Sequence, residues 1–123
     1  MSAAQALPHE ELLRAGSALV GCPPLALTKW RGRSNRIYVA GIYLRKDLDP
    51  ADLIDAVVIA VRRDGTGNSA GLAKAESVAD IADAAVARAF LAALPKAVTE
   101  LHLHRLEPSA KGRARIVADL EPE

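Results

Sequence analysis

The spacing of hydrophobic residues in the first half of the chain predicts one helix followed by two strands. Residues 8–20 carry leucines and a valine at helical spacing, after a proline and close to two acids that favour a helix start. Residues 37–44 are apolar on both faces of an extended chain, which is typical of a strand inside a sheet. Residues 56–63 are dense in valine and isoleucine and predict a second strand.

The second half of the chain predicts a long helix and then a β-hairpin. Asp49 and Pro50 favour a short helical turn just before the second strand. The alanine-rich residues 71–94 predict one long helix, in which Ser77 and Asp80 have the spacing of a capping box. Residues 98–106 and 113–120 predict two strands, joined by a loop over residues 107–112.

This order of elements, α-β-β-α-β-β, predicts an α+β fold. We expect two layers, with a four-stranded, mostly antiparallel sheet and the helices on one face. The length of 123 residues fits a single domain over residues 1–123, with a loose leader at 1–7, a basic connector at 25–36 and a tail at 121–123. Since residues 37–44 are apolar on both faces, we expect a second subunit to cover the other face of the sheet.

Composition narrows the class of protein. Half of the residues are hydrophobic, which supports a packed core. Aromatic residues make up only 3%, so a single chain buries little large apolar surface, and self-association would bury more. The formal charge of +1 lacks the positive balance of a typical nucleic-acid-binding domain. A single cysteine, Cys22, cannot form an internal disulfide, so we expect a cytoplasmic protein. No apolar run reaches the ~18 residues that a membrane-spanning helix needs.

A histidine row in the strand predicted over residues 98–106 offers the sharpest candidate chemistry. Glu100, His102 and His104 fall on one face of an extended chain, with Leu101 and Leu103 on the other. Adjacent imidazoles and a carboxylate suit acid–base catalysis or a metal site, although no further ligand stands at a diagnostic spacing. The alternative is an ordinary solvated face, ion-paired across the hairpin. We predict no metal ion and no cofactor.

A glycine-rich segment between the second strand and the long helix is a candidate anion site. Gly65, Gly67 and Ser69 can turn backbone N–H groups toward an anion, and Glu76 follows closely. The segment resembles the Gly-x-Gly-Ser-Ser-Ala loop of the galactokinase and homoserine kinase group, whose members are more than twice as long. A plain turn is the alternative.

One further resemblance involves residues 76–82, Glu-Ser-Val-Ala-Asp-Ile-Ala. They are similar to a Glu-Thr-Leu-Ala-Glu-x-Ile-Ala segment of dihydroneopterin aldolases. The resemblance implies that Glu76 anchors a pterin-like ring and that the ligand site lies between subunits. Glu107 departs from that family's pattern, which has a lysine before the proline.

Positive charge gathers in the predicted connector, around the only tryptophan of the chain. Cations beside an aromatic ring suit a phosphate backbone and a stacked base. The alternatives for this segment are a solvated connector or a contact with an acidic protein. The tryptophan could instead cover an open end of the hydrophobic core. This basic patch consists of Lys29, Trp30, Arg31, Arg33 and Arg36.

Three functions follow from these features. We expect first a binding or accessory domain that acts by self-association or through a protein partner, because no complete catalytic set is present. The second is a small oligomeric enzyme or binder of an anionic heterocycle or phosphorylated small molecule, with its site between subunits. The third is nucleic-acid contact through residues 29–36. No membrane partner is expected.

Overall fold

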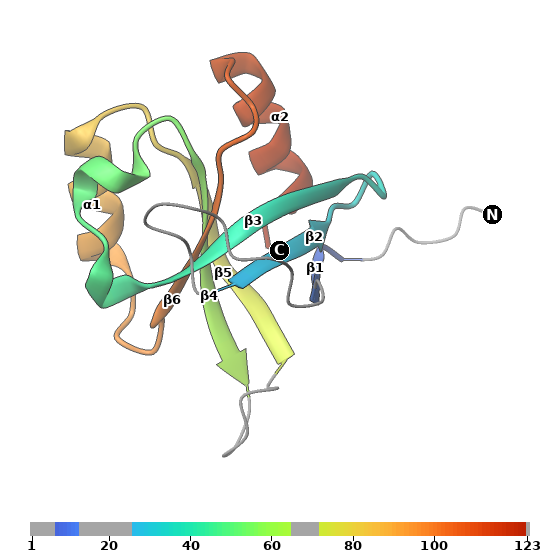
Figure 1. Ribbon diagram of the computed structural model, residues 1–123, viewed down its shortest axis with the longest axis horizontal. Coiled ribbons are helices and arrows are strands. Elements are labelled where there is room, and N and C mark those ends of the chain that lie inside the picture. Colours follow the sequence, from blue (N-terminus) through green and yellow to red (C-terminus); the bar gives the residue numbers. More distant parts are fainter. Residues whose placement is uncertain (1–6, 13–25, 65–71, 123) are drawn as a thin grey trace.

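Six strands form a single antiparallel sheet in the order β1-β2-β3-β6-β4-β5 (Figure 1). The structure is a computed structural model that describes residues 7–12, 26–64 and 72–122. The strands are β1 (His9–Leu12), β2 (Ala26–Arg31), β3 (Ile37–Leu44), β4 (Val57–Asp64), β5 (Leu72–Asp80) and β6 (Glu100–His104). The helices are η1 (Arg45–Asp47), η2 (Pro50–Leu53), α1 (Ala84–Ala93) and α2 (Ala110–Leu120).

The sheet curls into a half-barrel. Its two end strands in the order above, β1 and β5, lie in contact with each other. A β-bulge contributes to the curl: Ala60 pairs with Ser77 but Val61 pairs with Ala75, so that Glu76 is the extra residue of β5. A bulge of this kind bends its strand and increases the local twist.

A hydrophobic core lies on each face of the curled sheet. Strand β4 alternates between the two cores, with Val57, Ile59 and Val61 on the inner face and Val58 and Ala60 on the outer face. The inner core is completed by Trp30 and by Ile116 and Leu120 of α2, and the outer core by Leu53, Ala87 and Leu94. Helices α1 and α2 therefore cover opposite faces, and Figure 1 shows them on different sides of the sheet.

The predicted four-stranded, two-layer sheet with helices on one face is wrong, and two of its errors lie before residue 37. Residues 9–12 form strand β1 instead of the start of a helix. The predicted connector contains strand β2, in which Thr28 and Trp30 are buried while Lys29 and Arg31 are only partly buried. This is the period-two alternation of a strand, and the threonine and the basic residues obscured it.

The predicted long helix over residues 71–94 is also wrong. Its first part is strand β5, in which Ala73 and Ala75 are partly buried and Lys74 and Glu76 are exposed. Helix α1 begins only at Ala84, and its N-cap is Asp83, whose side chain accepts a hydrogen bond from the Val86 backbone N–H. Alanine favours helices intrinsically, but pairing with β4 decides the conformation here.

The last predicted strand, over residues 113–120, is helix α2 instead. Its buried residues Arg113, Ile116 and Leu120 are spaced by three and four, which places them on one helix face. The predicted hairpin loop over residues 107–112 consequently leads into a helix, and Ser109 caps it by accepting from the Gly112 N–H.

Other local predictions are confirmed. Strand β3 has the predicted bounds, strand β4 is shifted by one residue, and β6 lies inside the predicted 98–106 strand. The helical turn after Asp49 is η2, where the Asp52 side chain accepts from the Asp49 N–H. The chain therefore combines strands and helices in an α+β arrangement, and no helix among the described residues is long and apolar enough to cross a membrane.

Candidate functional site

The histidine row lies on the inner face of the half-barrel. Glu100, His102 and His104 share that face, and Leu101 and Leu103 join the outer core, as the alternation predicts. The row is not a solvated face, because His102 is fully buried and His104 is 6% exposed. Strand β6 sits between β3 and β4 in the middle of the curled sheet, which removes it from solvent.

Both ring nitrogens of His102 have a partner. The Trp30 Nε1–H donates to His102 Nδ1 at 3.0 Å, so Nδ1 acts as an acceptor. The other nitrogen, Nε2, then carries the proton and donates to Glu100 Oε1 at 2.9 Å. Both nitrogens of the ring are thus engaged by other side chains of the protein, and neither is open to a substrate.

One guanidinium joins the two carboxylates of this region. Arg63 of β4 donates to both oxygens of Glu100, at 2.8 and 3.0 Å, and also to Glu10 of β1 at 3.2 Å. Glu10 also accepts from the Thr28 hydroxyl at 2.6 Å. We call this set the interior histidine cluster; its members are Glu10, Thr28, Trp30, Arg63, Glu100 and His102.

The interior histidine cluster fits a structural role. Within the described part of the chain, no buried side-chain polar atom lacks a hydrogen-bond partner, and no three His, Cys, Asp or Glu side chains are placed to hold a metal ion. The cluster fastens three parts of the half-barrel to one another: the end strand β1, the strand β2 and the adjacent strands β4 and β6. His104 is similarly engaged, because its Nδ1–H donates to the Val39 carbonyl at 2.7 Å.

The cluster makes the stability of the fold sensitive to acid. Burial opposes ionisation of Glu100, but hydrogen bonds from His102 and Arg63 outweigh it and lower the pKa of Glu100 from 4.5 to about 2. The ionised form is therefore favoured by folding. Its contribution to stability is complete above the unfolded pKa and disappears as the pH falls through about 2.

We therefore predict that Glu100→Gln and the unmodified protein respond differently to acid. Urea unfolding between about pH 5 and about pH 2 should show the unmodified protein losing stability more steeply, so that the difference between the two shrinks as the pH falls. A difference that stayed constant over this range would contradict the assigned ionisation of Glu100.

The candidate anion site is only partly described by the structure. Gly65, Gly67 and Ser69 lie outside the described residues, as does Cys22. Glu76 lies at the β-bulge of β5, where it is exposed and forms an ion pair with Arg62 at 3.4 Å. The segment similar to dihydroneopterin aldolases is thus mostly a strand.

The basic patch of residues 29–36 is divided between several partners. Lys29 and Arg31 both contact Glu11 of β1, at 3.7 and 2.7 Å, and the hydrogen bond from Arg31 is the main cause that lowers the Glu11 pKa to about 2. Trp30 is fully buried against His102, so its ring does not face solvent. Arg33 binds the end of α2 through the backbone carbonyls of Ala118 and Glu121.

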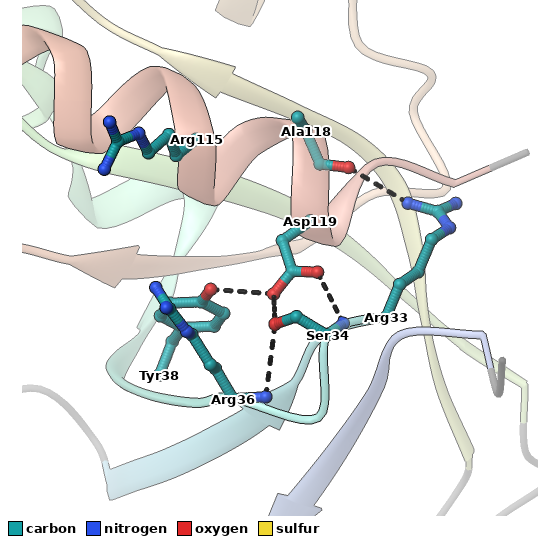
Figure 2. Close-up of a pocket in the computed structure, with 7 residues that line it drawn as sticks. All are labelled: Arg33, Ser34, Arg36, Tyr38, Arg115, Ala118 and Asp119. Atoms are coloured by element: carbon teal, nitrogen blue, oxygen red, sulfur yellow. Dashed lines mark hydrogen bonds between the residues drawn. The ribbon is translucent and has the colours of Figure 1, made fainter.

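Arg36 remains, and it lines a pocket between the β2–β3 turn and helix α2 (Figure 2). The pocket has a volume of about 420 Å³ and opens widely to solvent. We call it the arginine pocket; it is lined by Arg33, Ser34, Arg36, Tyr38, Arg115, Ala118 and Asp119.

The turn that forms one wall of the arginine pocket is built around the Asp119 carboxylate. Asn35 adopts a positive φ of 75°, and Gly32 lies so close to Asp119 that an added Cβ would come within 2.0 Å of its carboxylate. Any larger residue at position 32 would displace the Asp119 carboxylate. The Arg33 backbone N–H donates to the Asp119 carbonyl at 3.1 Å, which fixes the turn to the helix.

Three donors occupy the Asp119 carboxylate. The Ser34 N–H and hydroxyl donate to its two oxygens at 2.7 and 2.6 Å, and the Tyr38 hydroxyl donates at 2.7 Å. Burial opposes ionisation, but the Ser34 and Tyr38 hydrogen bonds lower the pKa of Asp119. Burial and the bond to Asp119 in turn raise the pKa of Tyr38 to about 12, so the phenol stays protonated as a donor.

Two arginines of the pocket, Arg36 and Arg115, have guanidinium groups that are available to a ligand. No described residue forms a hydrogen bond or an ion pair with the guanidinium of Arg36 or of Arg115. In Figure 2 both side chains extend on the Tyr38 side of Asp119, whereas Arg33 extends to the other side, toward Ala118. Sequence reasoning missed Arg115, Tyr38 and Asp119, because the contact between residues 33–38 and α2 depends on the fold.

Comparisons with protein-family models, curated proteins and solved structures found no match to this chain. Its function must therefore be argued from its own residues.

Proposed function

We propose that the chain is a binding domain for an anionic, phosphate-bearing ligand, held in the arginine pocket. The observation that carries the proposal is the pair Arg36 and Arg115, two guanidinium groups that line one pocket without a hydrogen bond or ion pair to any described residue. The pocket is lined by three arginines and one carboxylate, so its net charge is positive.

The chemistry of the guanidinium group supports a phosphate as the ligand. Arginine offers a planar fork of N–H donors that matches two phosphate oxygens at once. The oxygens of Asp119 accept hydrogen bonds from Ser34 and Tyr38, so the carboxylate attracts Arg36 by its charge but forms no direct hydrogen bond with it. Arg33 keeps the walls together through its bonds to α2.

The test is a calorimetric titration with inorganic pyrophosphate. We expect the double variant Arg36→Ala/Arg115→Ala to bind at least about tenfold more weakly, because one charge-assisted hydrogen bond contributes about 1.5–3 kcal/mol. Folding should be unaffected, since neither guanidinium bonds to the described protein. Arg88→Ala is the matched control, because Arg88 is exposed on α1, across the sheet. Equal affinity of the double variant and the control would contradict the proposal.

A binding role is preferred to an enzymatic one because the nitrogens of His102 and the carboxylate of Glu100 already have partners. A cytoplasmic location and self-association stay predictions. The sequence-based reason for expecting a partner subunit, an uncovered second face of the sheet, no longer holds, because α2 of the same chain packs on the inner face. Native mass spectrometry would measure the assembly directly.

A further inference from the structure

A second pocket lies on a different part of the molecule, where the end of β3 meets the loop between α1 and β6. Its volume is about 560 Å³, which is in the range that binds small organic ligands, about 300–1,000 Å³. Apolar atoms make up most of its surface. We call it the lysine pocket; it is lined by Leu44, Arg45, Lys46, Lys96, Val98 and Thr99.

The walls of the lysine pocket are held together by Arg45. Its backbone N–H donates to the Thr99 carbonyl at 2.8 Å, which ties the start of η1 to the α1–β6 loop. Its guanidinium donates to four carbonyls at the end of α1 and in this loop, those of Leu91, Leu94, Pro95 and Val98, at 2.8 to 3.4 Å. A cation at the C-terminal end of a helix is also favoured by the helix dipole. The pocket is therefore formed before any ligand binds.

The charge of the lysine pocket is positive and unopposed by its own lining. Lys46 and Lys96 are exposed, and neither forms a hydrogen bond or ion pair with a residue that the structure describes. The described lining residues include no carboxylate. Val98, by contrast, is fully buried and belongs to the outer core, and Leu44 is partly buried. Two ammonium groups thus stand beside an apolar surface.

We propose that the lysine pocket binds a small amphiphilic anion, a molecule with an apolar body and one carboxylate, sulfonate or phosphate group. The apolar body covers the partly exposed Leu44 side of the pocket, and the anionic group pairs with Lys46 and Lys96. This complementarity differs from that of the arginine pocket, which has an aspartate and two hydroxyl groups in its lining. The lysine pocket is independent of the proposed function, because the two pockets share no residue.

The test uses 8-anilinonaphthalene-1-sulfonate, an apolar aromatic anion that fluoresces when it leaves water. We expect saturable binding of one dye per chain and displacement of the dye by decanoate, but not by pyrophosphate. The double variant Lys46→Gln/Lys96→Gln should bind the dye at least about tenfold more weakly, because both charged contacts to the sulfonate are lost. Lys111→Gln is the matched control, because Lys111 is exposed on α2. Circular dichroism of every variant confirms that the fold is retained.

Three outcomes would overturn this inference. Absence of saturable binding is the first, and binding unchanged in Lys46→Gln/Lys96→Gln is the second. The third is displacement of the dye by an acidic, leucine-containing peptide but not by decanoate, which would make the pocket a peptide-binding site. Pyrophosphate binding should be unchanged in the lysine variant, and dye binding unchanged in the arginine variant, so the two proposals can fail separately.

Discussion

Replacement of Arg63 by methionine is expected to lower the free energy of unfolding by up to about 3 kcal/mol, the lower end of the cost of removing one partner from a buried ion pair, because this pair is partly buried. Arg63 forms ion pairs with both Glu10 and Glu100, and its methionine variant would leave both partly buried carboxylates without this cation. Urea unfolding followed by circular dichroism measures the change. A triple variant that adds Glu10→Gln and Glu100→Gln should recover part of the loss, because the buried negative charges are then gone.

The neighbouring residue provides a matched control for this experiment. Arg62 points to solvent from the same strand, and its ion pair with Glu76 is exposed, with 54% and 34% of the two side chains accessible. A surface pair of this kind contributes only about 0–1 kcal/mol. If Arg63→Met cost no more than Arg62→Met, the interior histidine cluster would not hold the half-barrel together.

Replacement of His102 by leucine is the second change with a large expected effect. It removes the acceptor of the Trp30 N–H and the donor to Glu100, so that two buried groups each lose a partner. Glu100 keeps its hydrogen bonds from Arg63, but the Trp30 N–H is left unsatisfied. An unsatisfied buried group costs about 1–3 kcal/mol, so the variant should lose about that much stability. Urea unfolding measures this loss, and His9→Gln, at an exposed histidine, is the control.

The same variant separates a structural from a functional histidine. If His102 only holds the half-barrel, folded His102→Leu protein should bind pyrophosphate with the affinity of the unmodified protein. A variant that kept its stability but lost ligand binding would instead place His102 in a ligand site.

The strands with the strongest hydrophobic pattern were predictable from the sequence. Residues 37–44 and 57–61 are runs of β-branched and apolar residues, and their strands β3 and β4 flank β6 inside the sheet. The elements that were misassigned have weak or mixed patterns. Ala73 and Ala75 alternate with Lys74 and Glu76, but alanine is small and favours helices, so the strand is recognisable only beside β4.

Helix α2 was misassigned because a buried arginine hides its apolar face. Arg113 is 6% exposed, since Asp80 accepts from it at 2.8 Å and the Pro108 carbonyl at 2.9 Å. In the sequence it reads as a solvent-facing residue of a strand. Its burial depends on the distant residue Asp80, which local pattern reasoning does not place nearby.

The candidate sites were predictable only as far as local geometry reaches. That Glu100, His102 and His104 share a face follows from strand geometry. Their burial does not, because Trp30 and Glu10, which cover His102, come from parts of the sequence that predict a connector and a helix. The arginine pocket likewise joins a turn to a helix 81 residues further along the chain, through the bond between Tyr38 and Asp119.

The most direct test of the account is an NMR titration of isotope-labelled protein with pyrophosphate, because it shows where an anion binds. The account predicts that the largest amide shifts fall at residues 33–38 and 115–119, around the arginine pocket, and that residues 100–104 change little. Largest shifts at residues 100–104, or at Gly65, Gly67, Ser69 and Glu76, would contradict it and would move the site to the histidine row or to the glycine-rich segment.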